Sequence, residues 1–333
     1  MIITRTPFRI SFFGGGTDYP VWFEKNGGAT LSTSIDKYCY ITVRRFPPFF
    51  EHKIRFVWSK IELANHADEI EHPTARESLK FLGLNDGVEI HHNGDLPARS
   101  GLGSSSTFVV GLLNALYALK GESASKSKLT LDSIHIEQER LASNVGCQDH
   151  VAAAFGGFNK VIYGGEDHIK VVPVNASKER LQKLESNLML FFTGLSRNAS
   201  DIAGEQIKNT PQKEAELHKM MGMVDQAIDI LSDEKRDMDD FGRMLRETWQ
   251  LKRQLSSRIT NSHIDEVYER GRNAGALGGK LLGAGGGGFM LFYVNPAAQP
   301  RVKSALADLL HVPFKFEHEG SQIIYHTHEP NIA

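Results

Sequence analysis

Residues 97–106 read Pro-Ala-Arg-Ser-Gly-Leu-Gly-Ser-Ser-Ser, and this run constrains the fold of the chain more than any other segment. A strand-like segment at 88–92 precedes it, and an apolar helix with hydrophobic residues at three- and four-residue steps follows it. Gly101 and Gly103 allow the backbone to turn with its N–H groups inward, and a helix that begins at Ser104 adds the positive end of its dipole. Such a run on its own is typical of a flexible linker. A strand before it and a helix after it indicate a phosphate-binding turn instead.

Two familiar nucleotide-binding motifs do not fit the glycines near residue 280. Gly279-Lys280 resembles the end of a P-loop, but Leu281 stands where serine or threonine must bind Mg²⁺. Residues 283–288 satisfy the pattern G-x-G-x-x-G, yet the chain that follows is too short for a doubly wound dinucleotide-binding domain. A nicotinamide-dependent dehydrogenase therefore remains only as an alternative, which tight binding of NADH without binding of ATP would support.

Three segments together carry a resemblance to a known superfamily. Residues 6–19 contain the string Gly-Gly-Gly-Thr-Asp-Tyr at 14–19, residues 97–106 are the run described above, and residues 280–289 contain four consecutive glycines. With these motifs in this order, the chain resembles the GHMP kinases, which include galactokinase, homoserine kinase, mevalonate kinase and phosphomevalonate kinase. The motifs span nearly the whole chain, so the resemblance covers both domains of that fold.

The resemblance implies an α+β fold of two domains. The amino-terminal domain would be like the second domain of ribosomal protein S5, and the carboxy-terminal domain would be ferredoxin-like, with ATP and substrate between them. The local pattern is compatible with this, because strands dominate the first part of the chain and long amphipathic helices the second. The expected domains are residues 1–180, which would bind ATP, and residues 181–333.

Two details point to the heptose and fucose kinase branch of the superfamily. Galactokinases place Glu-His in the middle of the first motif to hold galactose hydroxyls, and residues 14–19 lack that pair. Residues 193–197, after an apolar strand at 188–192, are similar to the Thr-Gly-x-Ser-Arg segment of that branch. The expected reaction is transfer of a phosphoryl group from ATP to the anomeric hydroxyl of a heptose 7-phosphate. A fucose kinase, or a catalytically silent protein that senses sugar and ATP, stays open as an alternative.

Phosphoryl transfer from ATP needs positive charge and Mg²⁺ on the phosphates, and a group that accepts the proton of the acceptor hydroxyl. By resemblance, the Glu-Arg pair at 139–140 makes Glu139 the carboxylate ligand of Mg²⁺, with a hydroxyl from Ser104 or Ser105 as a second ligand. The alternative for Glu139 is an exposed position on the helix surface, beside His135.

Asp149 and Arg9 are the expected catalytic residues. Asp149 resembles the catalytic aspartate of the superfamily, although an aspartate before an apolar helix is also a common N-cap. Arg9 stands where relatives keep a cation near the transferred phosphoryl group, and it would stabilise charge there. An arginine on an alternating strand can equally face water. A silent relative has no need of Arg9, Glu139 and Asp149 together, which favours an active enzyme.

The remaining site residues follow the motifs. The second motif is expected to bind ATP and its phosphates through Pro97, Ser100, Gly101, Leu102, Gly103, Ser104, Ser105 and Ser106. The substrate is expected to contact Gly15, Gly16, Thr17, Asp18, Arg197, Gly285 and Gly286. Of these, Asp18 would hold a sugar hydroxyl or simply close an Asx turn, and Arg197 would hold the distal phosphate through two hydrogen bonds.

Bulk properties argue against several classes of protein. The net charge of −2 favours neither nucleic acid nor an anionic membrane as a partner. The two cysteines form no CxxC motif, which indicates a reducing compartment. The amino end shows no basic and apolar leader, and no run approaches the ~20 apolar residues of a membrane span, so a cytoplasmic protein is expected. A homo-oligomer is left open.

Overall fold

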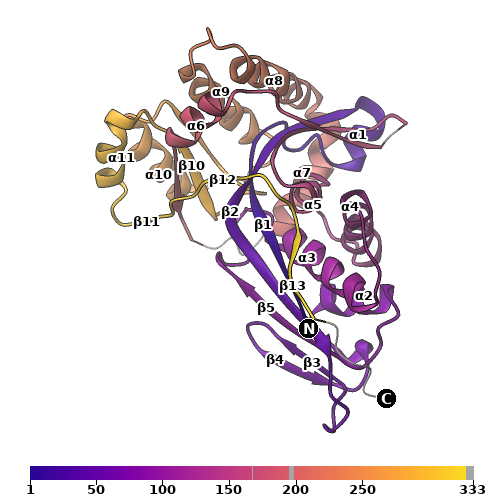
Figure 1. Cartoon of the computed structure of the whole chain (residues 1–333). Coiled ribbons are helices and arrows are strands. Elements are labelled where there is room, and N and C mark those ends of the chain that lie inside the picture. The colour runs from indigo at the N-terminus through magenta and orange to yellow at the C-terminus, as the bar shows by residue number, and fades with distance from the viewer. Residues whose placement is uncertain (167, 195–198, 328–333) are drawn as a thin grey trace.

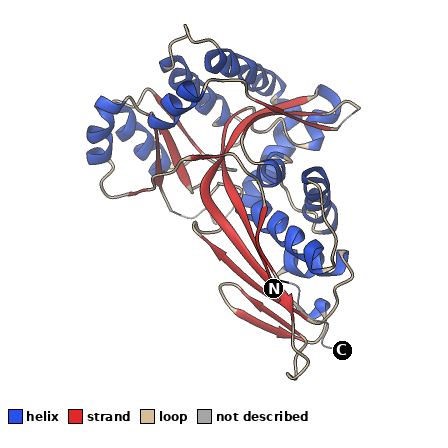
Figure 2. Cartoon of the chain, viewed as in Figure 1, coloured by secondary structure: helices blue, strands red, loops and turns tan. Residues whose placement is uncertain are grey.

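The computed structural model describes residues 1–166, 168–194 and 199–327 of the 333-residue chain. Within these ranges the chain forms two β-sheets, and helices pack against each of them (Figures 1 and 2). The predicted α+β class is therefore confirmed.

The larger sheet has nine strands, and six of them follow the order β13-β1-β2-β5-β3-β4. Its strands are β1 (Ile2–Phe13), β2 (Gly28–Arg45), β3 (Ile54–Val57), β4 (Ile61–Ala64), β5 (Val88–Gly94), β6 (Phe158–Tyr163), β7 (Ile169–Pro173), β12 (Phe316–Glu317) and β13 (Gln322–His326). The strands β3 and β5 are parallel, and the other neighbours are antiparallel. The long strand β2 joins the sheet together, because it pairs with β1, with β5 toward its end, and with β6 and β12 toward its start.

The strand β2 is continuous where the sequence pattern predicts two strands, at 29–35 and 38–43. Its pairing with β1 shifts register at two points, and at the larger shift Pro7 lies opposite Tyr38 while Phe8 lies opposite Ile35. The intervening residues of β2 are absorbed as a bulge, which bends a strand without ending it. The polar pair Asp-Lys at 36–37 therefore marks a bulge and not a turn.

Helices α2 (Pro73–Phe81), α3 (Ser104–Leu119), α4 (Lys126–Ile134) and α5 (Gln148–Phe155) lie along one face of the larger sheet (Figure 1). The central helix α3 packs on β1 and β2 and is buried around most of its circumference, as expected for a helix that is apolar on nearly all sides. Shorter elements in this part of the chain are α1 (Pro20–Asn26), the 3₁₀ turn Ala67–Glu69 and the π-helical turn His135–Arg140, which continues α4.

The smaller sheet has four antiparallel strands in the order β11-β8-β10-β9. They are β8 (Leu188–Phe192), β9 (Gly278–Leu281), β10 (Phe289–Tyr293) and β11 (Leu310–His311). The helices of this part are α6 (Lys178–Ser186), α7 (Ala199–Asn209), α8 (Glu214–Ser232), α9 (Asp239–Lys252), α10 (Ser262–Asn273) and α11 (Gln299–Ala305), with 3₁₀ turns at Thr210–Gln212 and Pro296–Ala298.

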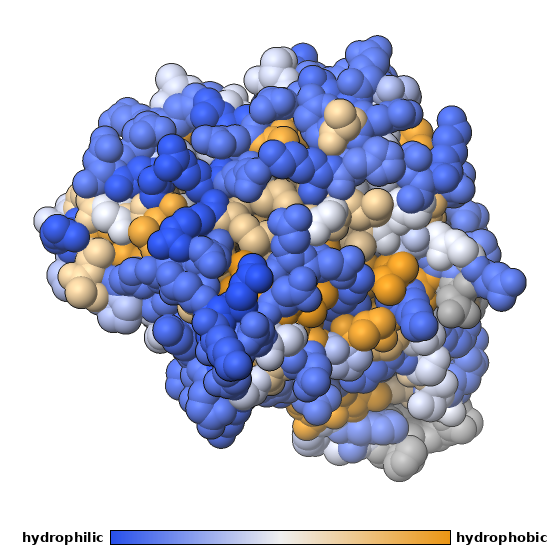
Figure 3. All heavy atoms as spheres, turned by 90° about the horizontal axis from the view of Figure 1, so that it is seen from above, coloured by the Kyte–Doolittle hydropathy of each residue, from blue (hydrophilic) through white to orange (hydrophobic). Residues whose placement is uncertain are grey.

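Hydrophilic residues cover most of the face seen from above, and apolar residues show only in patches between them (Figure 3). The apolar sides of α8 and α9 thus face inward.

The end of the chain returns to the larger sheet. The strand β12 pairs with β2, and β13 pairs with β1, which would otherwise be an open edge. The domain boundary near residue 180 stays a prediction: β7 ends at Pro173 and β8 begins at Leu188, but the last two strands share the first sheet. None of the helices in the described ranges is both long enough and apolar enough to cross a membrane.

Candidate active site

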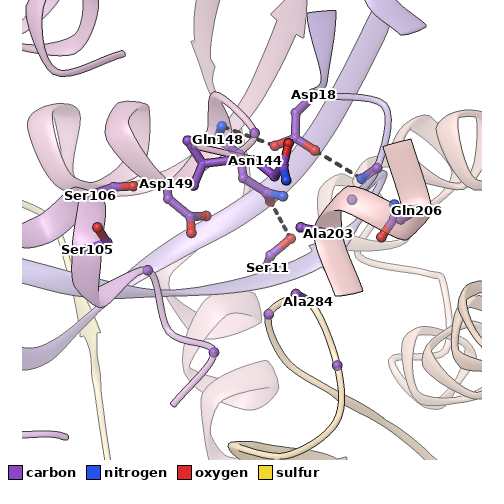
Figure 4. Close-up of a pocket in the computed structure, with 18 of the residues that line it drawn as sticks. Ser11, Asp18, Ser105, Ser106, Asn144, Gln148, Asp149, Ala203, Gln206 and Ala284 are labelled. Atoms are coloured by element: carbon purple, nitrogen blue, oxygen red, sulfur yellow. Dashed lines mark hydrogen bonds between the residues drawn. The ribbon is translucent and has the colours of Figure 1, made fainter. Parts of the chain in front are cut away.

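A cavity of about 460 Å³ is lined by elements of both sheets and by all three of the glycine-rich segments. Figure 4 shows Ser105 and Ser106 near one end of the site, Asp149 in the middle, and Asp18 and Gln206 toward the other end. One end is therefore rich in hydroxyl groups, and the other is rich in amides and has a carboxylate.

The second and third glycine-rich segments pack main chain against main chain. A Cβ added at Gly101 would lie 2.5 Å from the carbonyl oxygen of Leu282, and one added at Gly283 would lie 2.4 Å from Cα of Gly101. The N–H of Phe289 also donates to the carbonyl of Ser100, at 3.1 Å. Glycine is needed here for close approach, so the two segments form one rigid wall and not a flexible linker.

The start of α3 presents its N–H groups and hydroxyls to the cavity. Gly103 is the N-cap residue and has φ of +80°, a left-handed conformation that glycine adopts without strain. Five of the eight predicted phosphate-binding residues line the cavity: Gly101, Gly103, Ser104, Ser105 and Ser106. Of the other three, Leu102 and Ser100 are buried behind the loop, and Pro97 does not reach the cavity. The arrangement suits an anion, because free N–H groups and the helix dipole converge on one point.

Arg9 and Asp149 form an ion pair in the middle of the cavity. Nε and one terminal nitrogen of Arg9 lie 2.7 and 2.6 Å from Oδ1 of Asp149, and the other terminal nitrogen donates to the carbonyl of Gly101 at 2.8 Å. Arg9 is only 4% exposed, so it does not face water. Asp149 lies one residue inside α5, whose N-cap is Cys147, so its carboxylate does not cap that helix. The structure brings together the two residues that were predicted to be catalytic.

The structure does not bring Glu139 into the cavity. Its side chain is 71% exposed and pairs with His135 at 2.8 Å, which is the exposed alternative. Glu137 lines the cavity instead: it is 2% exposed, and it accepts hydrogen bonds from the hydroxyls of Ser105 and Ser106, the latter at 2.9 Å. The structure therefore corrects the expected position: Glu137, two residues earlier, and not Glu139, lies at the cavity.

The geometry of the helix explains this difference. Residues two apart on a helix point in nearly opposite directions, so Glu137 and Glu139 cannot share a face. Within the turn His135–Arg140 the N–H of Leu141 bonds to the carbonyl of Ile136, five residues back. A sequence signal for Glu137 did exist, since it follows the buried residues Leu129 and Ser133 at steps of four.

Glu137 is held as a carboxylate by its partners. Burial pushes the pKa of this carboxyl up, but the hydrogen bond and attraction from His150, together with the two serine hydroxyls, outweigh burial and hold the pKa below its ordinary value. Nε2 of His150 lies 2.7 Å from Oε2 of Glu137, inside the protein. A buried carboxylate with three donors and an opening to the cavity can serve as an oxygen ligand for a hard cation.

Asp18 lies at the far end of the cavity and is 1% exposed. Its carboxylate accepts from the N–H of Gly16 at 3.0 Å and from the N–H of Gln148 at 3.3 Å. Burial raises the pKa of Asp18 and the negative charge of Asp149 adds to the rise, while the two N–H groups oppose it. A Cβ at Gly146 would lie 1.9 Å from Oδ2 of Asp18, so only glycine leaves room for this carboxylate.

The other predicted substrate residues divide into two groups. Gly15, Gly16 and Gly285 line the cavity. Thr17 is buried and donates to the carbonyls of Gly14 and Ala29, so it supports the first loop from behind, and Gly286 bonds to Ile259 behind the third loop. Arg197 lies outside the described residues.

Several cavity residues were missed by sequence reasoning. Ser11 donates to Oε1 of Gln148 at 2.6 Å, and Asn144 and Gln206 also line the cavity (Figure 4). These are single polar residues outside any motif, and only the fold brings them together. Gln148 is next to Asp149 in the sequence but carries no charge that would single it out.

Two buried lysines also line the cavity. Lys252 donates from Nζ to the carbonyls of Leu281, at 3.0 Å, and Gly283, while Lys280 donates to the carbonyls of Ser11 and Phe12, at 2.9 and 2.8 Å. Burial lowers the pKa of Lys252 to about 7, with the charge of Arg9 adding to this, and it also lowers the pKa of Lys280. Lys280 is thus a buried lysine that links β9 to β1.

Two regions of the chain match families of known proteins. Residues 58–157 match the family described as GHMP kinases N terminal domain, and residues 226–311 match the one described as GHMP kinases C terminal. Together the two regions make up more than half of the chain.

One similar protein is the D-glycero-alpha-D-manno-heptose 7-phosphate kinase of Campylobacter jejuni, which is 29% identical over 92% of this chain and 93% of its own length. A putative sugar kinase from the same species has a crystal structure that covers 97% of this chain and 98% of that one, with a TM-score of 0.69 at 26% identity. The crystal structure of a D-glycero-D-manno-heptose 1-phosphate kinase from Bacteroides thetaiotaomicron covers 98% and 100% of the two chains, with a TM-score of 0.73 at 24% identity, and shows the same fold.

Proposed function

This chain belongs to the GHMP kinase superfamily, whose members transfer a phosphoryl group from ATP to an alcohol, and on that premise we propose that its acceptor is the anomeric hydroxyl of D-glycero-D-manno-heptose 7-phosphate. The product would be the 1,7-bisphosphate. The observation that carries the proposal is the Arg9–Asp149 pair, which lies between a phosphate-binding turn and a polar, acidic end of the same cavity. Similarity to the Campylobacter jejuni heptose 7-phosphate kinase along nearly the whole chain supports the choice of sugar.

The triphosphate of ATP is proposed to bind at the start of α3. Gly101, Gly103 and the three serines offer N–H groups, hydroxyls and the positive end of a long helix to phosphate oxygens. Arg9 lies beside this turn and bonds to the carbonyl of Gly101, so its charge acts on the same region. Preorganised charge of this kind stabilises the transferred phosphoryl group where its charge develops.

Glu137 with Ser105 or Ser106 is proposed to hold Mg²⁺, in place of Glu139. Magnesium in phosphoryl-transfer sites is commonly bound by one or two carboxylates together with substrate phosphates, and the described residues offer one buried carboxylate and two hydroxyls beside the phosphate turn. When bound, the ion neutralises charge on the phosphate oxygens.

The proton of the acceptor hydroxyl is proposed to pass to Asp149. The anomeric oxygen attacks the γ-phosphorus of ATP, the bond from that phosphorus to the bridging oxygen breaks, and ADP leaves. Arg9 donates twice to Oδ1 of Asp149, and within the described ranges no donor bonds to Oδ2, which leaves that oxygen for the sugar hydroxyl. An anomeric hydroxyl is more acidic than an ordinary alcohol, so a carboxylate is sufficient as the acceptor.

Asp18 and its neighbours are proposed to select the sugar. Its carboxylate lies at the end of the cavity away from Ser105 and Ser106, where the amides of Gln148 and Gln206 can also bond to hydroxyl groups (Figure 4).

Arg197 is proposed, from its position in the sequence alone, to hold the distal phosphate of the substrate. Arg197→Ala should then raise KM for heptose 7-phosphate more than for the unphosphorylated sugar.

The proposal is tested by incubating the protein with Mg-ATP and a panel of heptose 7-phosphate, unphosphorylated heptose, fucose and galactose, and locating the new phosphate by phosphorus NMR. The expected result is a new anomeric phosphate formed fastest on heptose 7-phosphate. Faster turnover of fucose, or a phosphate on another carbon, would contradict the proposed substrate while leaving the kinase class intact.

A further inference from the structure

His150 is a buried ring whose polar contacts all point to one carboxylate. It is 0% exposed, and its Nε2 lies 2.7 Å from Oε2 of Glu137. Its other nitrogen, Nδ1, is also buried and has no hydrogen-bond partner among the described residues. A buried polar atom without a hydrogen-bond partner costs free energy of folding. The ring is therefore not a link in a longer hydrogen-bond chain, and its contact with Glu137 needs its own explanation.

The contacts of Glu137 give the two oxygens different surroundings. Oε2 accepts from His150 and from Ser106, both of which are buried. Oε1 accepts from Ser105, which is exposed and lines the cavity. Because an ionised carboxylate only accepts, the hydrogen of the imidazole must sit on Nε2. One oxygen is therefore anchored inside the protein, and the other is presented to the cavity.

We propose that His150 is a positioning residue that fixes the Glu137 carboxylate so that Oε1 and the Ser105 hydroxyl face the metal of the bound nucleotide together. This inference rests on the proposed role of Glu137 as a metal ligand. Partners behind metal ligands are known to orient them and to be worth about 10–100-fold in metal affinity.

His150 lies in the first turn of α5, directly after Asp149, so its contact with Glu137 also links the two proposed functional carboxylates. Gln148, Asp149 and His150 are consecutive in the first turn of α5, and their side chains bond to Ser11, Arg9 and Glu137 respectively. One helical turn thus connects the strand β1, the proposed proton acceptor and the proposed metal ligand. A shift of the metal carboxylate relative to Asp149 would misplace the phosphate relative to the acceptor hydroxyl, and such misplacement is costly in phosphoryl transfer.

Two amide substitutions separate this role from simple packing. In His150→Gln the side-chain N–H reaches about as far from Cβ as Nε2 does, so it can still donate to Glu137. In His150→Asn the N–H stands near the position of Nδ1 and cannot reach. The readout is the dissociation constant of ATP in EDTA divided by that of Mg-ATP, both measured by calorimetry without acceptor. The wild-type ratio records how much the metal contributes to nucleotide binding.

The expected result is a ratio near that of the wild type for His150→Gln and a ratio lowered about tenfold for His150→Asn. If His150→Asn does not fold, His150→Met removes the donor without burying an unpaired amide, and the same loss is expected. An unchanged ratio in a folded donor-free variant, or an equal loss in His150→Gln, would overturn the inference.

Glu137→Gln is measured beside these variants. If it too leaves the ratio unchanged, the assignment of Glu137 as a metal ligand fails. If it lowers the ratio while His150→Asn does not, only the inference about His150 fails.

Discussion

At the scale of single residues, Lys252 shows how the cavity places charge where water is excluded. Its ammonium group bonds to two carbonyls of the third glycine-rich segment and lies close enough to Arg9 for their charges to repel. Burying a cation costs free energy unless its surroundings compensate. The anionic phosphates proposed to bind in this cavity would provide that compensation.

The buried position of Lys252 predicts a specific dependence of stability on pH. Burial lowers its pKa to about 7 in the folded protein, whereas a lysine in the unfolded chain titrates near 10.4, as is usual. Below pH 7 both states are charged and the cost of burial is constant. From pH 7 to about 10 the unfolded state binds more protons, so this group makes the wild type more stable as pH rises, by at most about 1.4 kcal/mol per pH unit.

Lys252→Met lacks this contribution, so the free energy of unfolding of the wild type should rise relative to that of the variant between pH 7 and 9. Urea unfolding of both proteins at several pH values measures the difference. Two curves that stay parallel over this range would show that Lys252 keeps an ordinary pKa in the folded state.

Glu137 and Glu139 provide a matched pair for the metal site. Glu137→Gln should raise the Mg²⁺ concentration for half-maximal turnover by about tenfold or more, because even residues behind a metal ligand are worth this much. Glu139→Gln should leave it unchanged, since the Glu139 side chain is exposed at the surface, where it pairs with His135. A Mg²⁺ titration of turnover measures both, and a larger effect in Glu139→Gln would restore the original expectation.

The residue scale is also where sequence reasoning was weakest. Arg9 was recognised because it stands inside the first motif, and Asp149 because it resembles the catalytic aspartate of the superfamily; the structure joins them directly. Lys252 lies in a helix that the sequence pattern predicts, but its partners come from a loop about thirty residues away, which local periodicity does not reveal. Glu137 was passed over because a π-helical turn and a neighbouring Glu-Arg pair obscured which glutamate shares the buried face.

At the scale of elements, the close contact of the two glycine-rich loops is the central feature. Gly283 has φ of +73°, and a Cβ there would lie 2.4 Å from Cα of Gly101. Gly283→Ala should therefore cost about 1–3 kcal/mol of stability through strain and overpacking, and should raise KM for ATP by displacing the phosphate turn.

The control for Gly283→Ala is Gly222→Ala in the helix α8. A Cβ at Gly222 meets nothing within 4 Å, and alanine is the better helix former, so this change should raise stability by about 0.5–1 kcal/mol. Melting curves and ATP titrations of the two variants check the prediction. Equal effects in the two variants would mean that the loops do not depend on glycine for contact.

Elements with strong local signals were predictable, and those defined by distant contacts were not. The strand β5, the turn and α3 follow from residues 88–119 alone, because turn chemistry and helix periodicity are local. That β2 is one continuous strand depends on how it pairs with β1. The two-residue strand β12 forms only because β2 lies beside it. Such pairings are set by tertiary contacts.

At the scale of the whole molecule, the last described strand closes the edge of the sheet that carries Arg9. Ser321, just before β13, hydrogen-bonds to Thr6 in β1 at 2.8 Å and to Asn114 in α3 at 3.0 Å. Ser321→Ala leaves both partners without this hydroxyl, so a loss of about 1–3 kcal/mol in the free energy of unfolding is expected. Ser186→Ala is the control, since the exposed hydroxyl of Ser186 donates to the carbonyl of Lys183 in its own helix, and its removal should change stability by less than about 0.5 kcal/mol. Denaturant unfolding measures both, and equal losses would mean that the chain end adds little to the larger sheet.

In the proposed reaction, this cavity transfers a phosphoryl group with Asp149 as the proton acceptor. Its most direct test is the turnover number of Asp149→Asn, measured on one preparation together with a melting curve and an ATP titration by calorimetry. Asparagine keeps the size of the side chain, and the proposed ATP-binding turn lies at Gly101 and Gly103, so the variant should fold and bind ATP as the wild type does. Loss of the proton acceptor should lower kcat by ~10²–10⁴. A folded Asp149→Asn protein that binds ATP and turns over at the wild-type rate would contradict the account.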